Sequence, residues 1–353
     1  MQIIRPDINI DFVGRRKIAF FFSSLLIALT IFTLIIRKGP NWGVDFTGGI
    51  VIHIKMKQEF LPAEIRKALS PIGLEDSIVQ EFEERGSHEY LIRVRKKGIE
   101  LSGLDDKVKD ILEDRFGKVE IRRIEMVGPK VGRDLREKAL LAIFYSILFM
   151  AIYISGRFEL KWTISAAVAL ALAGVVYIAS LMGVGLSWLI IIALIVTLLL
   201  CWFLKLRYAL GAIVALIHDV TITLGVFAFT NKEISLSIIA AFLTIVGYSL
   251  NDTIVVFDRI RENIKRLRKI PFTQIMNRSI NETLSRTILT SGTTLLVVFV
   301  LVILGGGVIH DFAFAILIGI IVGTYSSIYI ASPVLLLWED SSGKRKRVSR
   351  SAK

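Results

Sequence analysis

The sequence of 353 residues contains a single cysteine, Cys201, which lies in an apolar run. One thiol excludes an internal disulfide framework and a cysteine-based metal site within this chain. Charge is also scarce outside one stretch: residues 37–138 hold 21 Lys or Arg and 19 Asp or Glu, whereas the rest hold 23 and only 12. With 54% hydrophobic residues and a mean hydropathy of +0.63, there is too little polar surface to cover a soluble protein of this size. The composition predicts a polytopic membrane protein with one soluble domain.

Eight apolar runs are long enough to cross a bilayer, which takes about 20 helical residues. They are residues 18–36, 138–155, 161–183, 186–204, 208–230, 235–257, 286–304 and 311–337. The first run follows three basic residues, is too long for the apolar core of a signal peptide and precedes no small-residue cleavage site, so we expect a retained anchor. An even number of spans places both termini on one side of the membrane. The third and fourth runs are separated by only a few residues.

Basic residues are distributed very unevenly over the two sides of this predicted bundle of residues 138–337. The side of the termini carries 21 Lys or Arg: four before the first span, two at 157–161, two at 205–207, seven at 259–278 and six in the tail. The short loops on the other side carry one, Lys232. By the positive-inside rule, the N-terminus (1–17), the 258–285 segment and the tail (338–353) are cytoplasmic, and residues 37–137 lie outside.

The net charge of +13 is therefore explained by the basic residues that set the orientation of the protein in the membrane. Because the basic residues are spread over five membrane-flanking segments and form no single patch, the sequence does not indicate nucleic-acid binding.

Residues 258–269 combine a narrow apolar stripe with many basic side chains. This pattern is typical of an amphipathic helix resting on anionic lipids at the cytoplasmic face, although a coupling role stays open.

The outside segment alternates short apolar strands with amphipathic helices. Strands are predicted at 50–56, 77–83, 89–95 and 118–126, helices at 62–69 and 104–116, and a turn at 85–87. The order β-α-β-β-α-β is that of the split βαβ, ferredoxin-like arrangement, in which one sheet face stays open unless a partner covers it. His53 and His88 have no cysteine or paired carboxylates nearby, so the sequence indicates neither a metal site nor a catalytic set.

Ionisable residues at membrane depth are few, and such residues are costly and usually functional. His218 and Asp219 lie near the middle of the fifth span, and Asp252 lies about five residues to the cytoplasmic side of the centre of the sixth. Arg286 begins the seventh span at its cytoplasmic edge. Because these last two spans are consecutive, the two residues lie at similar depth and Arg286 can reach toward Asp252. Polar neighbours on the same helices are Ser249, Asn251, Thr253 and Thr287.

A carboxylate beside a guanidinium in lipid is suited to proton-driven work. Burial raises the pKa of a carboxyl group and a nearby cation lowers it, so such a group can exchange protons near neutral pH. Protonation would leave Arg286 unpaired and favour a second helix arrangement. Three alternatives stay open: a static ion pair that sets helix register, a structural scaffold, and an intramembrane aspartyl protease that uses Asp219 and Asp252.

Two long motifs resemble the SecD/SecF protein-export family, and the second is similar to its SecF branch. Residues 41–49 (NWGVDFTGG) carry the DFTGG signature, and residues 247–263 (GYSLNDTIVVFDRIREN) carry the other hallmark. Residues 281–292 and the His218-Asp219 pair are also similar. The likeness covers nearly the whole chain outside 160–205, and it implies a member of the resistance-nodulation-division superfamily.

The resemblance implies a non-enzymatic subunit of the Sec translocase in the bacterial inner membrane. Its partners would be SecD, the SecYEG translocon, YajC and exported unfolded polypeptides, with the proton gradient as energy source and no cofactor or metal. Asp252 matches the family's proton-pathway carboxylate, Arg286 its partnering arginine, and Asp219 an additional relay residue with His218 in support. The signature loop is Asp45, Phe46, Thr47, Gly48 and Gly49, for which we expect a structural role in close backbone packing.

The predicted span count departs from the six that are typical of this family. The additional pair lies near 161–204. Residues 161–170 align with 207–216 at an offset of 46 residues, with four of ten positions identical, and Leu172-Ala173 then replace His218-Asp219. One hypothesis is a degenerate copy of the fifth and sixth spans that packs peripherally. Chance similarity between Ala-, Val- and Leu-rich helices is the alternative.

Overall fold

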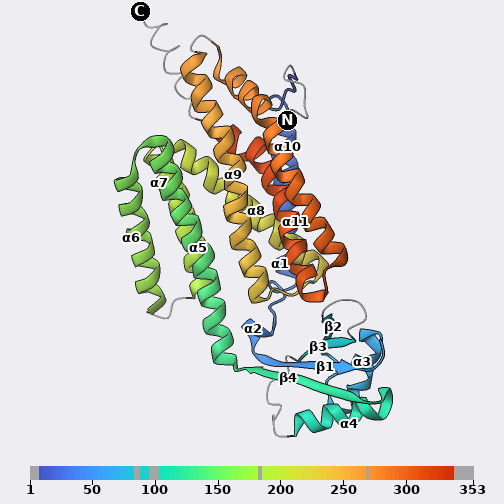
Figure 1. The fold of residues 1–353 in the computed structure, drawn as a ribbon. Helices are drawn as coiled ribbons and strands as arrows, with labels where there is room; N and C mark the ends of the chain where they lie inside the picture. Colours follow the sequence, from blue (N-terminus) through green and yellow to red (C-terminus); the bar gives the residue numbers. More distant parts are fainter. Residues whose placement is uncertain (1–7, 83–87, 95–102, 182–184, 268–269, 338–353) are drawn as a thin grey trace, which may run out of the picture.

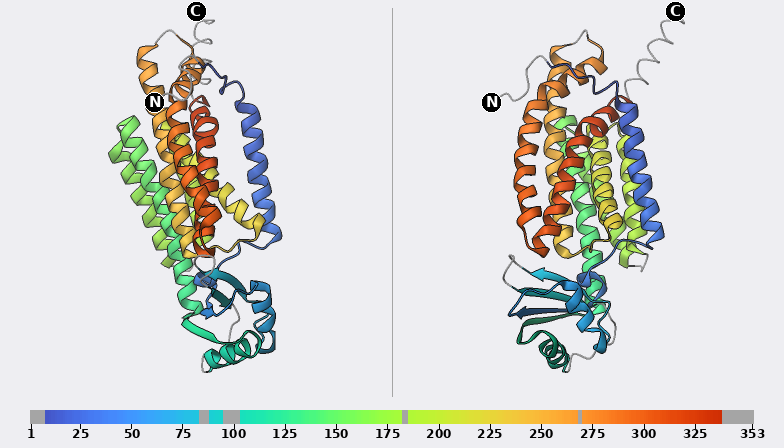
Figure 2. Two further views of the ribbon diagram at one scale, coloured as in Figure 1. Left: turned by 45° about the vertical axis from the view of Figure 1, so that its right-hand side comes forward. Right: turned by 90° about the vertical axis from the view of Figure 1, so that its right-hand side faces the viewer.

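The computed structural model describes residues 8–82, 88–94, 103–181, 185–267 and 270–337, in which a helical bundle is joined to a small sheet domain (Figure 1). The bundle helices are α1 (Arg16–Ile36), α5 (Pro129–Glu159), α6 (Trp162–Leu181), α7 (Leu186–Phe203), α8 (Arg207–Thr230), α9 (Leu236–Arg266), α10 (Phe272–Leu304) and α11 (Gly307–Ser326), followed by the π-helix η2 (Ser327–Ala331) and α12 (Ser332–Val334). The described chain begins and ends at the bundle end away from the sheet (Figure 2), here called the distal end.

Seven helices in the described ranges are long and apolar enough to cross a membrane. They correspond to seven of the eight predicted runs. The remaining helix, α7, is apolar but has only 18 residues. At 1.5 Å per residue this is about 27 Å, slightly less than the roughly 30 Å of a hydrocarbon core.

Two helices extend well beyond their predicted spans, and residues 258–266 of the predicted amphipathic segment form the end of α9. α9 continues without a break to Arg266, and α10 begins at Phe272, fourteen residues before the predicted span. The extensions pack against each other: Ile260 is fully buried in the same core as Met276 and Ile280 of α10, whereas Ile264 of the apolar stripe is 38% exposed. Asn263 Nδ2 donates to Ser279 Oγ at 3.0 Å and to Glu282 Oε2 at 2.8 Å. Ile260 and Asn263 therefore join the two helices into a hairpin at the distal end.

The sheet domain contains β1 (Gly49–Met56), α3 (Pro62–Ala68), η1 (Ser70–Ile72), β2 (Ile78–Phe82), β3 (Glu89–Val94), α4 (Leu104–Phe116) and β4 (Val119–Val127). All strand pairs are antiparallel, in the order β2-β3-β1-β4. Alternate residues of β1, from Ile50 to Met56, point into a core beneath α3 and α4, which cover one face of the sheet (Figure 1). The predicted turn at 85–87 lies outside the described residues.

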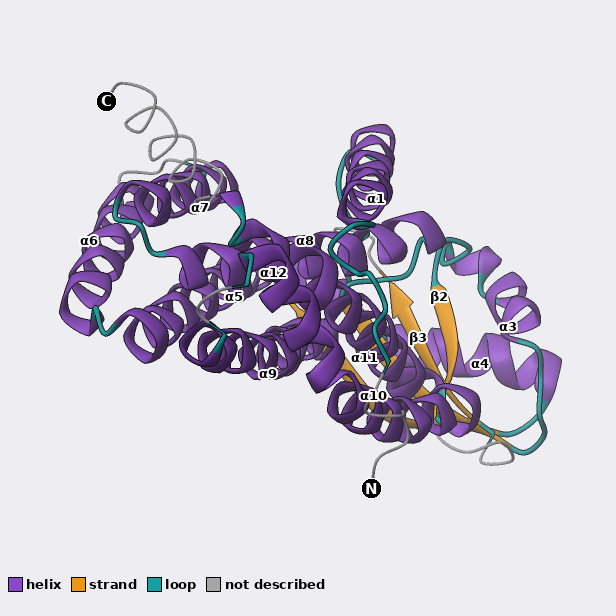
Figure 3. Ribbon diagram, turned by 90° about the horizontal axis from the view of Figure 1, so that it is seen from above, coloured by secondary structure: helices purple, strands orange, loops and turns teal. Residues whose placement is uncertain are grey.

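The hairpin of α6 and α7 packs at one side of the bundle, against α5 and α8 (Figure 3). Its core consists of apolar side chains such as Phe144, Leu148 and Ala193. Ser155 and Ser165 form a buried hydrogen bond of 2.6 Å between α5 and α6. The hairpin lies away from α9, α10 and α11, the helices that carry most of the polar residues described below.

The signature loop joins the sheet to the start of α9. Asp45, in the short helix α2 (Val44–Thr47), accepts a hydrogen bond of 2.8 Å from the Leu236 amide at the first turn of α9, where a carboxylate also interacts favourably with the helix dipole. The Asn41 carbonyl accepts from the Ile234 amide, also at 2.8 Å. Gly49 has φ +149°, and a Cβ there would lie 2.2 Å from the Val94 carbonyl oxygen. Only glycine fits this approach of β1 to β3.

Candidate functional site

Asp252 lies on α9 with its side chain turned into the bundle and 3% exposed. Its Oδ2 accepts a hydrogen bond of 2.8 Å from Ser291 Oγ on α10 and a longer one of 3.4 Å from Thr324 Oγ1 on α11. Three helices thus meet at one carboxyl group. A hydroxyl can donate to a carboxylate or accept from a carboxylic acid, so this surrounding fits both protonation states.

In this structure Arg286 forms no ion pair with Asp252, although its charge acts on that carboxyl group. Among the ion pairs of the described residues, none joins the two side chains within 4.0 Å. The reason is helical geometry: Arg286 and Ser291 are five residues apart, so they point about 140° apart around α10. The rotation of α10 about its axis that brings Ser291 to Asp252 directs Arg286 outward, where its side chain is exposed.

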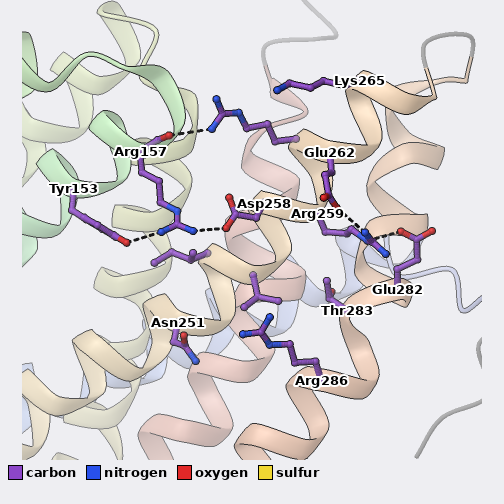
Figure 4. A pocket seen from close by; sticks show the side chains of 13 residues that line it. Tyr153, Arg157, Asn251, Asp258, Arg259, Glu262, Lys265, Glu282, Thr283 and Arg286 are labelled. Carbon is purple, nitrogen blue, oxygen red and sulfur yellow. Dashed lines mark hydrogen bonds and ion pairs between the residues drawn. The ribbon is translucent and has the colours of Figure 1, made fainter. Parts of the chain in front are cut away.

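Arg286 instead lines a cleft of about 860 Å³ between α5, α9 and α10 (Figure 4). Its side chain extends from α10 toward the part of α9 that carries Asn251, the residue next to Asp252. Higher in the cleft, Arg157 Nη2 lies 2.6 Å from Asp258 Oδ2 and Arg259 Nε lies 2.8 Å from Glu282 Oε2. The cleft gives water access to within one helical turn of the Asp252 backbone.

Asp219 forms a second buried polar centre on α8 and has no exposed surface. Its Oδ2 accepts hydrogen bonds from Ser249 Oγ on α9 at 2.5 Å and from Ser326 Oγ at the end of α11 at 2.8 Å. The Nδ1 atom of His218 lies 2.8 Å from its Oδ1. On the other side of the imidazole, Nε2 lies 3.0 Å from Ser23 Oγ on α1. A continuous polar path therefore runs from α1 to Asp219.

Asp219 and Asp252 are contacted by some of the same helices, but each carboxyl group is bound by different hydroxyl groups. Ser249, which donates to Asp219, is one turn from Asp252 on α9, and Thr324 and Ser326 are two residues apart on α11. Within the described residues, no hydrogen bond joins the two carboxyl groups directly. An aspartyl dyad requires two carboxyl groups that share a proton, and this arrangement keeps them on separate hydroxyls.

The remaining predicted polar residues have different surroundings. Asn251 faces the cleft. The Thr253 hydroxyl donates to the Ser249 carbonyl at 3.3 Å, one turn back along α9. The Thr287 hydroxyl is buried and has no partner in the described part of the chain.

Sequence reasoning missed the hydroxyl residues Ser23, Ser291, Thr324 and Ser326. They occur in apolar helices, where serine and threonine commonly bond to the carbonyl four residues earlier and carry no special role. Ser326 is followed directly by the π-helix η2, a kind of insertion that is frequent at functional sites. A π-helix leaves no clear pattern in the sequence, so only the fold distinguishes these hydroxyls from others.

Fold and site define a polytopic membrane protein with buried acidic centres and one α+β domain at an end of its bundle. The family described as "Protein export membrane protein SecD/SecF, C-terminal" matches residues 107–199 and 180–341, and the SecD/SecF GG motif matches residues 33–59. The chain belongs to the SecF branch of this family. It is 41% identical to the protein translocase subunit SecF of Magnetococcus marinus, over 99% of this chain and 97% of that protein. It is 43% identical to that of Vibrio alginolyticus, over 95% and 91%.

Solved structures of the translocon-associated membrane protein SecDF are similar to the whole chain. The SecDF crystal structure from Thermus thermophilus matches with a TM-score of 0.69 and 32% identity over 96% of this chain. SecDF in its super-membrane-facing form matches with a TM-score of 0.61 and 30% identity. The chain spans about two fifths of each of these longer chains, 40% and 41%.

Proposed function

We propose that this protein is a subunit of the Sec translocase that couples inward proton movement to late export of polypeptides across the bacterial inner membrane, together with SecD. The names of its relatives support the translocase assignment. The observation that carries proton coupling is the Asp252 carboxyl group, which is buried at membrane depth, held by hydroxyls of two other helices and one turn from a cleft. The role in this proposal is non-enzymatic transport, in line with the relatives, which are named as translocase subunits.

In this proposal Asp252 takes up and releases the proton and Asp219 is a second relay group. Hydroxyls of α10 and α11 bind Asp252 and hydroxyls of α9 and α11 bind Asp219, so a proton can pass between hydroxyl-bonded groups without leaving an unsatisfied charge. Arg286 acts as the mobile partner: it faces the cleft in the arrangement described above and approaches Asp252 when that carboxyl group is ionised. In this proposal, the arrangement in which the two side chains are separated is the one that a protonated Asp252 favours.

The wider assembly follows from the same family. We infer that α7 completes eight spans, that the termini are cytoplasmic, and that the sheet domain is ferredoxin-like and lies outside. Since the chain spans about two fifths of SecDF, SecD supplies the remainder of the machine. SecYEG and YajC are further partners, exported chains are the cargo, and the basic distal end faces anionic lipids. The overlap of the two family matches over 180–199 is what a duplicated hairpin would produce.

The test is export driven by a proton gradient in vesicles that contain the complex with SecD. Asp252→Asn keeps the shape and hydrogen-bonding capacity of the side chain but cannot be ionised, so we expect proton-dependent export to be lost while SecD still co-purifies. Asp258→Asn is the matched control, because this carboxylate lies on the same helix in an exposed pair with Arg157. Normal export by Asp252→Asn would favour the alternative, a scaffold subunit that carries no protons.

A further inference from the structure

An extended segment before α1, residues 8–14, crosses the distal end of the bundle and binds the side of α10 (Figure 2). Two asparagines hold its main chain. Asn281 Oδ1 accepts from the Ile10 amide at 2.9 Å and its Nδ2 donates to the Ile10 carbonyl at 2.9 Å. Asn277 Oδ1 accepts from the Phe12 amide at 2.8 Å, and its Nδ2 also donates to the Ile10 carbonyl. Residues four apart share one helix face, so the two amides act together.

The same segment contacts a second element of the bundle. Phe12 and Val13 are 8% and 4% exposed and belong to the main core of the bundle. The Phe12 ring packs edge-on against Tyr329, with ring centroids 5.9 Å apart. Tyr329 lies in η2, three residues after Ser326, the hydroxyl that donates to Asp219. The segment thus connects α10 to the element next to the Asp219 centre.

The position of α10 matters because this helix carries both Ser291 and Arg286. Its distal half packs into the main core of the bundle through Met276 and Ile280. In its most apolar 18 residues, by contrast, only 17% are buried, against 61% in α8, 56% in α9 and 50% in α11. Asn281 is ten residues from Ser291, about 15 Å along the helix. A tilt of α10 at its distal end would therefore change the distance between the Ser291 hydroxyl and Asp252.

We infer that residues 8–14 form a strap that positions α10, with Asn277 and Asn281 as the positioning residues that keep Ser291 on Asp252 and Arg286 in the cleft. This inference rests on the proposed proton coupling. Asn277 and Asn281 bind main-chain groups of the strap, so these hydrogen bonds do not depend on the side chains at positions 10 and 12. What depends on sequence is the apolar anchor, Phe12, and the pair of asparagines.

The experiment replaces the hydrogen bonds by a covalent link that can be opened. In the complex with SecD, Cys201 is changed to serine, the strap carries Ile10→Cys, and α10 carries Asn277→Ala and Asn281→Cys. Export driven by a proton gradient is then measured on one purified sample before and after reduction of the disulfide, so that folding and assembly are matched. We expect the oxidised complex to export at nearly the unmodified rate and the reduced complex to export roughly tenfold more slowly, since several hydrogen bonds to the strap are lost.

A distance measurement checks the cause. Spin labels at the exposed positions Gln274 on α10 and Lys205 before α8 report whether the distal end of α10 moves. Reduction should broaden the distance distribution, whereas Gln274→Ala without labels, which touches no strap bond, should leave export unchanged. Equal export in both redox states, or slower export with an unmoved α10, would overturn the strap. Export that persists in Asp252→Asn would instead refute proton coupling itself, so the two failures are distinguishable.

Discussion

The ion pair between Arg93 and Glu233 is predicted to hold the sheet domain on the bundle. Arg93 lies on β3 and Glu233 in the loop before α9, with Nη1 and Oε2 3.0 Å apart and side chains that are 16% and 5% exposed. Removing one partner of a well-buried pair costs about 3–5 kcal/mol. Because Arg93 keeps some contact with solvent, we expect about 2 kcal/mol for Arg93→Met or Glu233→Gln, which is roughly a 30-fold change in the opening equilibrium.

Hydrogen exchange measures this opening directly. The Ile234 amide donates to the Asn41 carbonyl and the Gly43 amide donates to the Ile234 carbonyl, both at 2.8 Å, so both exchange only when the domain separates from the loop. Each single variant should raise their exchange rates roughly 30-fold. The double variant should fall short of the additive effect, because the two side chains interact.

A surface pair on the same sheet serves as the control. Arg122 and Glu120 are 43% and 58% exposed, and exposed pairs contribute less than about 1 kcal/mol. Arg122→Met should therefore change exchange at Ile234 very little. Unchanged exchange in both single variants, or strict additivity in the double variant, would refute the idea that this pair holds the domain in place.

Two further predictions concern the sheet domain. Burial alone would raise the pKa of Glu89, but hydrogen bonds from Lys55 and His53 outweigh it and lower the pKa below its usual value. The stabilisation is therefore present at neutral pH and lost as the pH falls through the folded-state pKa; Glu89→Gln should flatten the acid limb of the melting temperature against pH, and an unchanged acid limb would contradict this. Gly49→Ala should cost well over about 1–2 kcal/mol, because left-handed backbone strain adds to a clash with the Val94 carbonyl. Gly247→Ala, where no atom beyond the adjacent backbone of α9 lies within 4 Å of the added Cβ, should melt no lower than the unmodified protein, and equal melting of both variants would argue against the close approach.

Hydrophobic patterning was sufficient to place the long elements. The strand and helix positions in the sheet domain agree with the prediction to within one or two residues, since alternation with period two in β1 and spacing of 3.6 in α4 reflect burial on one face. Helix ends were predicted less well. α9 and α10 extend past the apolar runs because their polar extensions pack against each other, and a hydropathy run records only contact with lipid.

The sequence alone could not predict which side chains contact each other at the site. The order of the spans correctly placed Asp252 and Arg286 on neighbouring helices, but the rotation of α10 about its axis decides which of its residues faces α9. That rotation directs Ser291 to Asp252 and Arg286 to the cleft. It depends on packing against α9 and α11 at its sides and on contacts at its distal end, none of which is encoded in local spacing.

Residue chemistry alone determined the class of this protein: long apolar runs, a strong asymmetry of basic residues, and a few acids where lipid makes charge costly. Those properties are additive along the chain and can be read one segment at a time. The tertiary structure decided which hydroxyls bind Asp252 and Asp219, where the cleft opens and how the sheet is attached to α9. These contacts join residues between 30 and 200 positions apart, and only the packed bundle selects them from the many serines and threonines that the helices contain.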